Sequence, residues 1–147
     1  MGHLIFSKKE YNKDEILKIK SENYFLVNIK LFTESYNYNN FFYKKVYISE
    51  IGEVKNSPFG KTIFGNLKEN NLENIVTNTD FKKIWDVKKD LIEVCKDCEF
   101  RYMCVDNRNP VQKNINEWYF EDQCHYDPYI NEWNTKNIWA ESGSAKK

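Results

Sequence analysis

The sequence lacks an excess of charge of either sign. Its 147 residues hold 22 lysines and arginines against 22 aspartates and glutamates, a formal net charge of zero. A nucleic-acid-binding domain or an anionic-membrane-binding protein usually shows a basic excess. The charge balance therefore gives no sign of nucleic acid or membrane as a partner.

Long apolar runs are also missing. The longest, such as residues 24–27, are far too short to cross a bilayer, and the first apolar residues run into Lys8, Lys9 and Glu10 with no signal-peptide core. We therefore expect a cytoplasmic protein.

Signatures of hydrolytic catalysis and of repeats are absent too. No pair of acidic residues is placed for general acid–base work, and no serine stands in a nucleophile elbow. There is no internal repeat and no second domain, and 41% hydrophobic with 16% aromatic residues allows a modest core. We expect one domain that is not catalytic by itself.

What is present is a cluster of four cysteines. Cys95-x2-Cys98-x5-Cys104 is completed by Cys124, and no cysteine lies elsewhere in the chain. The two-residue gap lets the first two thiolates leave one turn in the same direction, and the wider gaps bring the others from different sides. In a reducing compartment this spacing favours a metal site over disulfides. Zinc and an iron-sulfur cluster both accept such a cage.

The chemistry of four thiolates leaves alternatives open. Structural zinc sites with four thiolates are common and fold small domains. A zinc ribbon would usually end in a second C-x2-C pair, whereas Cys104 and Cys124 are twenty positions apart. Unliganded thiols are the third possibility.

Before the cysteines, residues 24–32 are rich in β-branched and aromatic side chains, which predicts a strand. Residues 42–48 and 54–56 predict a β-hairpin in which Gly52 takes the positive φ of the turn. Residues 71–76 predict one or two helical turns.

A central helix is predicted from Asn78 or Thr79, either of which can cap it, straight into Cys95. After the cysteine run, residues 107–116 look polar and irregular, residues 131–139 predict a short helix, and the last residues a frayed tail. The predicted central helix before Cys95 has one apolar and one polar face. The apolar face holds Phe81, Ile84, Trp85, Leu91 and Ile92, and the polar face holds Lys82, Lys83, Lys89 and Glu93.

With these motifs placed, residues 24–133 resemble the SPASM domain of radical S-adenosylmethionine peptide maturases. The resemblance is closest to the grasp-with-SPASM type, in which the enzyme is encoded with an ATP-grasp ligase and a precursor peptide. It implies a small α+β fold with a hairpin, a central helix and an irregular cysteine-rich region. We divide the chain into a lead-in (1–23), a SPASM-like domain (24–139) and a tail (140–147). The matching words are Thr33-Glu-Ser35, Lys45-Val-Tyr-Ile48, Gly52-Glu-Val-Lys-Asn56, Ser57-Pro58, Phe64-Gly-Asn66, Lys89-Asp90, Cys98-Glu-Phe-Arg-Tyr102 and Cys124-x-Tyr-Asp-Pro-Tyr129.

The resemblance also implies a cofactor. SPASM domains usually carry two auxiliary [4Fe-4S] clusters, and Cys95, Cys98, Cys104 and Cys124 match the ligands of the second. The ligand positions of the first hold Phe41, Ser57 and Asn107 or Arg108, so we expect a single [4Fe-4S] cluster, with zinc as the alternative.

The family's radical-forming C-x3-C-x2-C loop is missing from this sequence. The resemblance then implies an accessory role in modifying a ribosomally made peptide, by electron transfer, structural support or peptide binding. The chain would be a detached half of a split enzyme, a truncated product or a relict. Expected partners are a precursor peptide and a radical S-adenosylmethionine core or an ATP-grasp ligase. A zinc-stabilised interaction module without redox role is the alternative.

Three other side chains near the cysteines have two interpretations each. Arg101 and Arg108 could donate to cluster sulfur or bind a carboxylate, but local salt bridges with Glu99 or Asp106 are the simpler expectation. His125 could replace a thiolate, but an exposed histidine is the simpler expectation. Residues 118–120, Trp-Tyr-Phe, are expected to cover the cluster, and Trp85 to pack in the core.

Overall fold

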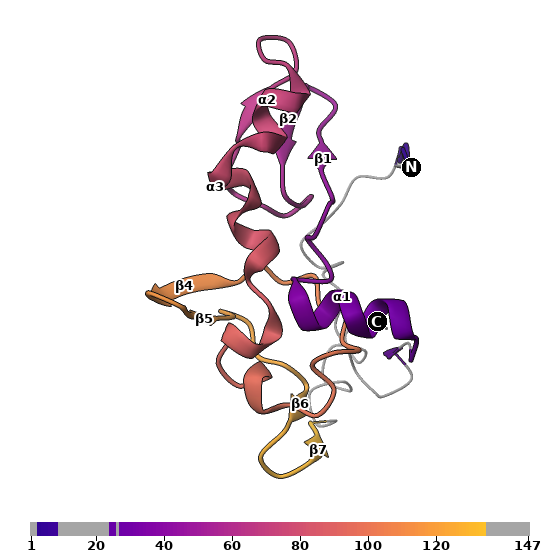
Figure 1. The fold of residues 1–147 in the computed structure, drawn as a ribbon, viewed down its shortest axis with the longest axis vertical. Helices are drawn as coiled ribbons and strands as arrows, with labels where there is room; N and C mark the ends of the chain where they lie inside the picture. Colours follow the sequence, from indigo (N-terminus) through magenta and orange to yellow (C-terminus); the bar gives the residue numbers. More distant parts are fainter. Residues whose placement is uncertain (1–2, 9–23, 26, 135–147) are drawn as a thin grey trace, which may run out of the picture.

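The computed structural model describes residues 3–8, 24–25 and 27–134. It has the expected α+β composition, with short helices and small antiparallel strand pairs. Figure 1 shows one sheet with helices α2 and α3 at one end of the long axis, and the β6–β7 pair at the other. Within the described residues, none of the helices has the length and apolar character of a membrane span. Most of the predicted lead-in and the whole predicted tail lie outside the described residues.

The predicted hairpin is confirmed. Strand β1 (Tyr47–Ile48) pairs antiparallel with β2 (Glu53–Lys55). Gly52 has a φ of 89°, and its amide donates a 2.9 Å hydrogen bond to the carbonyl of Ser49. Glycine takes this conformation without a steric cost, so it closes the hairpin turn. The strand is shorter than predicted, because residues 40–44 form a turn.

A third strand, β3 (Gly65–Asn66), joins the free edge of β2. The sheet packs on the short helices that follow, and Val54, Ile75 and Phe81 are buried between them. A Cβ at Gly65 would stand 2.7 Å from the side chain of Ile75, so a larger residue would push helix and sheet apart. The partly buried side chains around this core are Phe64, Leu72, Val76 and Trp85.

Two helical predictions here are confirmed at their starts. Helix α2 (Leu72–Thr77) covers the predicted turns, with Asn71 as its cap. Helix α3 (Thr79–Lys82) begins at the predicted cap, since the side chain of Asn78 accepts a 2.9 Å hydrogen bond from the amide of Asp80.

The prediction of one continuous helix into Cys95 is wrong. Helix α3 tightens into a 3-10 turn, η3 (Lys83–Asp86), breaks at Val87, and resumes as a second 3-10 turn, η4 (Lys89–Leu91). Asn39 holds the break: its amide donates to the carbonyl of Trp85 at 2.8 Å and its side chain to that of Val87 at 2.9 Å. The backbone amide and the buried side chain of Asn39 thus take carbonyls that a continuous helix would have used.

The strand predicted at residues 24–32 is also wrong. Helix α1 (Ile29–Asn37) begins there, because the side chain of Asn28 accepts a 2.7 Å hydrogen bond from the amide of Leu31 and caps it. The hydroxyl of Ser35, the buried residue of this helix, donates to the carbonyl of Leu31 at 2.7 Å. Capping and tertiary contacts have overridden β propensity, which is a weak preference.

The C-terminal half has two further hairpins. Strands β4 (Val111–Asn114) and β5 (Glu117–Tyr119) pair where an irregular segment was predicted, and Asn116 takes the positive φ of their turn at 65°. Strands β6 (Tyr126–Asp127) and β7 (Glu132–Trp133) pair where a helix was predicted over residues 131–139. That helix is wrong for residues 131–134, and residues 135–139 lie outside the described residues.

Candidate metal centre

The first two cysteines lie on one tight turn. The amide of Cys95 donates a 2.7 Å hydrogen bond to the carbonyl of Glu93, and the 3-10 turn η5 (Cys95–Asp97) follows. The amide of Cys98 then donates to the carbonyl of Cys95 at 3.1 Å. This is the one-turn arrangement that a C-x2-C pair needs to present both sulfurs to a common ligand.

The other two cysteines come from separate segments. The carbonyl of Cys104 accepts a 3.0 Å hydrogen bond from Asn40, whose amide also donates to Ser35, so this cysteine is tied to helix α1. Cys124 lies between β5 and β6 and is exposed, whereas the other three cysteines are half-buried. The amide of Tyr126 lies 3.5 Å from the sulfur of Cys124.

Burial disfavours the thiolate form of the inner cysteines. It raises the pKa of Cys98 to about 11 and of Cys104 to about 12, and it raises the pKa of Cys95 as well. Cys124 contributes to the raised pKa of all three inner thiols. The fold therefore brings the four cysteines within electrostatic range of each other.

The spacing of these groups differs from that of a single-ion site. In the described part of the chain, no three of the histidine, cysteine, aspartate and glutamate side chains are arranged to hold one metal ion. Four thiolates around zinc stand about 3.8 Å apart, which follows from a Zn–S distance near 2.3 Å and tetrahedral geometry. In a four-iron cluster each thiolate binds a different iron, so the sulfurs stand further apart.

Beside the cysteines lies a cluster of buried charges that the sequence did not predict. The ammonium of Lys89 is 3.0 Å from the carboxylate of Asp106, and the Nε of Arg108 is 3.0 Å from both oxygens of that carboxylate. Lys89 was placed on the polar face of a continuous helix, and that prediction is wrong because the chain breaks at Val87 and turns Lys89 inward. We call Lys89, Asp106 and Arg108 the buried charge cluster.

The buried charge cluster faces the thiols. Burial alone lowers the pKa of Lys89, but Asp106, and after it Cys104 and Cys95, raise it above its ordinary value. The aromatic ring of Phe120 covers the cations, with its centroid 4.7 Å from the ammonium of Lys89 and 4.2 Å from the guanidinium carbon of Arg108. One signal in the sequence pointed to part of this site, namely the expected pairing of Arg108 with Asp106, which follows two residues after Cys104.

Comparison with known proteins supplies the family. Residues 42–99 match the family model SPASM, described as an iron-sulfur cluster-binding domain. Residues 42–99 are therefore similar to a SPASM domain. The matched segment of this domain contains the hairpin, helices α2 and α3 and the first two cysteines, while Cys104 and Cys124 lie beyond its end. No curated protein and no solved structure matches the chain.

Both arginines near the cysteines form local ion pairs. The Nε of Arg101 lies 3.2 Å from Asp90, and its Nη1 donates a 2.9 Å hydrogen bond to the carbonyl of Cys98. A local salt bridge was expected for Arg101, but its partner is Asp90 rather than one of the two candidates, Glu99 and Asp106. The pairing of Arg108 with Asp106 is confirmed.

Three further predictions concern histidine and aromatic side chains. His125 is half-buried rather than exposed, and its carbonyl accepts a 2.6 Å hydrogen bond from the amide of Asn134. Trp118 stacks over the ammonium of Lys83 at 5.6 Å, so within residues 118–120 it is Phe120 that reaches the buried charge cluster. Trp85 packs against the core as predicted, in an edge contact with Phe81.

The positions linked by resemblance to the first auxiliary cluster are occupied by packed residues. Ser57 is 1% exposed and its hydroxyl lies 3.3 Å from the side-chain oxygen of Asn109. Asn107 is buried, and Phe41 stands edge-on to Phe42.

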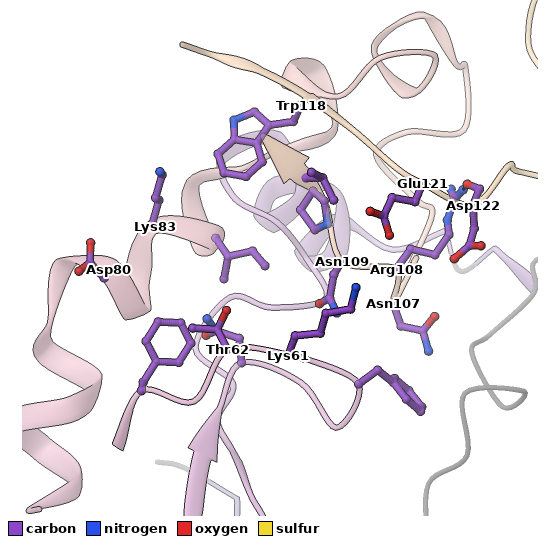
Figure 2. A pocket seen from close by; sticks show the side chains of 17 residues that line it. Lys61, Thr62, Asp80, Lys83, Asn107, Arg108, Asn109, Trp118, Glu121 and Asp122 are labelled. Carbon is purple, nitrogen blue, oxygen red and sulfur yellow. Dashed lines mark hydrogen bonds between the residues drawn. The ribbon is translucent and has the colours of Figure 1, made fainter. Parts of the chain in front are cut away.

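Next to these residues lies a cleft of about 490 Å³ between the hairpin end of the SPASM domain and β4. Figure 2 shows Arg108, Glu121 and Asp122 toward one end of it and Asp80 and Lys83 toward the other. Cations and anions both line the cleft, so its charge selects no ligand of one sign.

Proposed function

We propose that Cys95, Cys98, Cys104 and Cys124 hold one [4Fe-4S] cluster, and that the chain is the accessory, cluster-binding part of a radical S-adenosylmethionine system that modifies a ribosomally made peptide. The observation that carries the first half is the SPASM match, which ends one residue after the C-x2-C pair, on a fold that brings the four thiols within electrostatic range of each other. The second half extends the sequence resemblance to the grasp-with-SPASM type.

In this proposal the four thiolates occupy the protein-facing positions of the cluster, which supplies one-electron transfer when bound. The carbonyl of Cys104 is held by Asn40 from a distant segment, and the carbonyl of Cys98 by Arg101 three residues further along the same segment. Because the printed sequence has no C-x3-C-x2-C loop, the radical-forming core is supplied by a separate chain or a further segment, and the precursor peptide is the partner on which both act.

Single cysteine variants test the ligand set. The wild-type chain reconstituted without oxygen with iron and sulfide should give a brown protein with about four irons and four sulfides, as a cubane requires. Replacing any one of the four cysteines by serine should lower both contents, whereas Ser57→Ala, at a position tied to the first auxiliary cluster, should leave them unchanged. An iron content equal to that of the wild type in Cys104→Ser or Cys124→Ser would overturn the assignment of all four cysteines as ligands.

The accessory role has its own test. The reconstituted chain incubated with S-adenosylmethionine and a strong reductant should form no more 5′-deoxyadenosine than a cluster-free control. Formation above that control would show that the chain starts radicals itself.

A further inference from the structure

The buried charge cluster beside the cysteines has one more cation than anion. Lys89 and Arg108 are both paired with the single carboxylate of Asp106, so the three side chains together carry one positive charge. Their side chains are 4%, 11% and 3% exposed, respectively, so solvent screens this charge only weakly. A buried charge of this kind is costly unless an anion lies nearby.

This charge acts on the cysteine sulfurs, which become anionic thiolates when they bind a metal or a cluster. Lys89 is electrostatically coupled to Cys104 and Cys95, and Arg108 to Cys95 and Cys124. The two cations thus reach three of the four proposed ligands. The ring of Phe120 lies over both cations.

A simple structural role explains these observations less well. A buried lysine–aspartate pair would be neutral and would need no second cation. Arg108 nevertheless donates to the same carboxylate through Nε and Nη2, and through Nη1 to the carbonyl of Asp122. The geometry therefore fixes an uncompensated cation at the cysteines rather than only joining two segments.

We propose that Lys89 and Arg108, held by Asp106, are positioning residues that set the reduction potential of the cluster assigned to the four cysteines. The inference rests on that proposed function. A cluster with four thiolates is already negative, and reduction takes one electron from an added donor and makes it more negative by one charge. A fixed cation close by stabilises the reduced form more than the oxidised form, because Coulomb energy grows with the product of the charges. Net charge around a cluster is one of the factors that set its potential.

The test is an anaerobic redox titration with dithionite, following the visible absorption of the reconstituted chain. Lys89→Met removes one charge at similar volume and should move the midpoint potential to a more negative value. Lys89→Arg should keep it near that of the wild type. Arg108→Met removes the other cation and should also make the midpoint potential more negative. This second variant tests the inference if Lys89→Met does not fold.

The matched control is Lys113→Met. Lys113 forms an ion pair with Glu93 on the surface, with the two charged groups 2.7 Å apart, and solvent screens this charge. The midpoint potential of the cluster in this variant should therefore equal that of the wild type. A folded Lys89→Met or Arg108→Met protein with a loaded cluster and an unchanged or higher potential overturns the inference. Iron and sulfide contents of the wild type, measured in the same preparations, test the proposed function separately.

Discussion

The amide of Cys95 is bonded to the carbonyl of Glu93 across a single residue, at 2.7 Å. The residue between them, Val94, has φ 66° and ψ −49°, the conformation of the rare γ-turn with positive φ. A β-branched side chain is strained there, and strain of this kind costs on the order of 1–3 kcal/mol. The strained turn stands directly before the first proposed ligand, and it directs the chain from η4 into η5.

Val94→Gly should relieve this strain. Val94 is 43% exposed, so little apolar burial is lost, and glycine accepts the positive φ. Glycine also makes the unfolded chain more flexible, which offsets up to about 1 kcal/mol of the stability gained by relieving the strain. We expect the free energy of unfolding of the metal-free chain, measured in urea, to be unchanged or up to about 2 kcal/mol higher. The control is Val46→Gly, at 38% exposure and without a positive φ, which should destabilise. Equal destabilisation by both would show that Val94 is unstrained.

Cys98→Ala should loosen the cysteine region and leave the hairpin intact. Residues 94–129 contain few buried apolar side chains, so cluster binding should order them, as metal binding does in small domains. In hydrogen exchange of the anaerobically reconstituted proteins, amides of residues 94–129 should lose protection in the variant, while those of β1 and β2 keep it. Equal protection throughout would mean that the cluster does not hold this region together.

The metal-free chain should lose stability as the pH rises. Burial raises the pKa of Cys98 to about 11 and of Cys104 to about 12, from an ordinary value of 9.0 in the unfolded chain. A raised pKa means that the folded state retains protons that the unfolded state gives up, so the stabilisation is complete below pH 9.0 and is lost as the pH rises toward the folded values. Urea unfolding at about pH 8 and about pH 10 should show this fall.

Cys104→Ser is the control for this titration, because serine does not ionise in that range. The fall in stability between the two pH values should be smaller in the variant. An identical fall would assign the effect to groups other than the thiol of Cys104.

Phe81→Ala should destabilise the hairpin end strongly. Phe81 is completely buried, packs with Val54 and Ile75, and makes edge contacts with Phe64 and Trp85. Removing such a ring typically costs about 3–5 kcal/mol, which urea unfolding would detect. Phe32→Ala is the matched control, because Phe32 is 51% exposed and its loss should cost less than about 1 kcal/mol. Similar losses of stability in both variants would show that Phe81 does not form part of the hydrophobic core.

The sequence was most informative where one residue type has a single physical use. Gly52 predicted the hairpin turn because few other residues adopt its φ, and Asn78 predicted a helix start because its side chain caps one. The cysteine spacing likewise pointed to a metal centre, and the SPASM match supports iron-sulfur binding in this region.

The sequence was least informative where contacts between distant residues decide the local structure. The break at Val87 depends on Asn39, 48 positions away, and helix α1 depends on a cap that competes with its β-rich composition. Lys89 was predicted to lie on the surface because the helical pattern was extended past the break at Val87 and placed Lys89 on the polar face. Its burial with Asp106 exists only after the chain has folded, so the local pattern could predict the pairing of Arg108 with Asp106 but not that Lys89 joins them.

The central claim is that the four cysteines together bind one four-iron cluster, and native mass spectrometry of the chain purified without oxygen tests it most directly. The account predicts an added mass of four irons and four sulfides, as a cubane requires, lost in the variant in which all four cysteines are serine. An added mass of one zinc ion without sulfide would contradict it and make the chain a zinc-stabilised module.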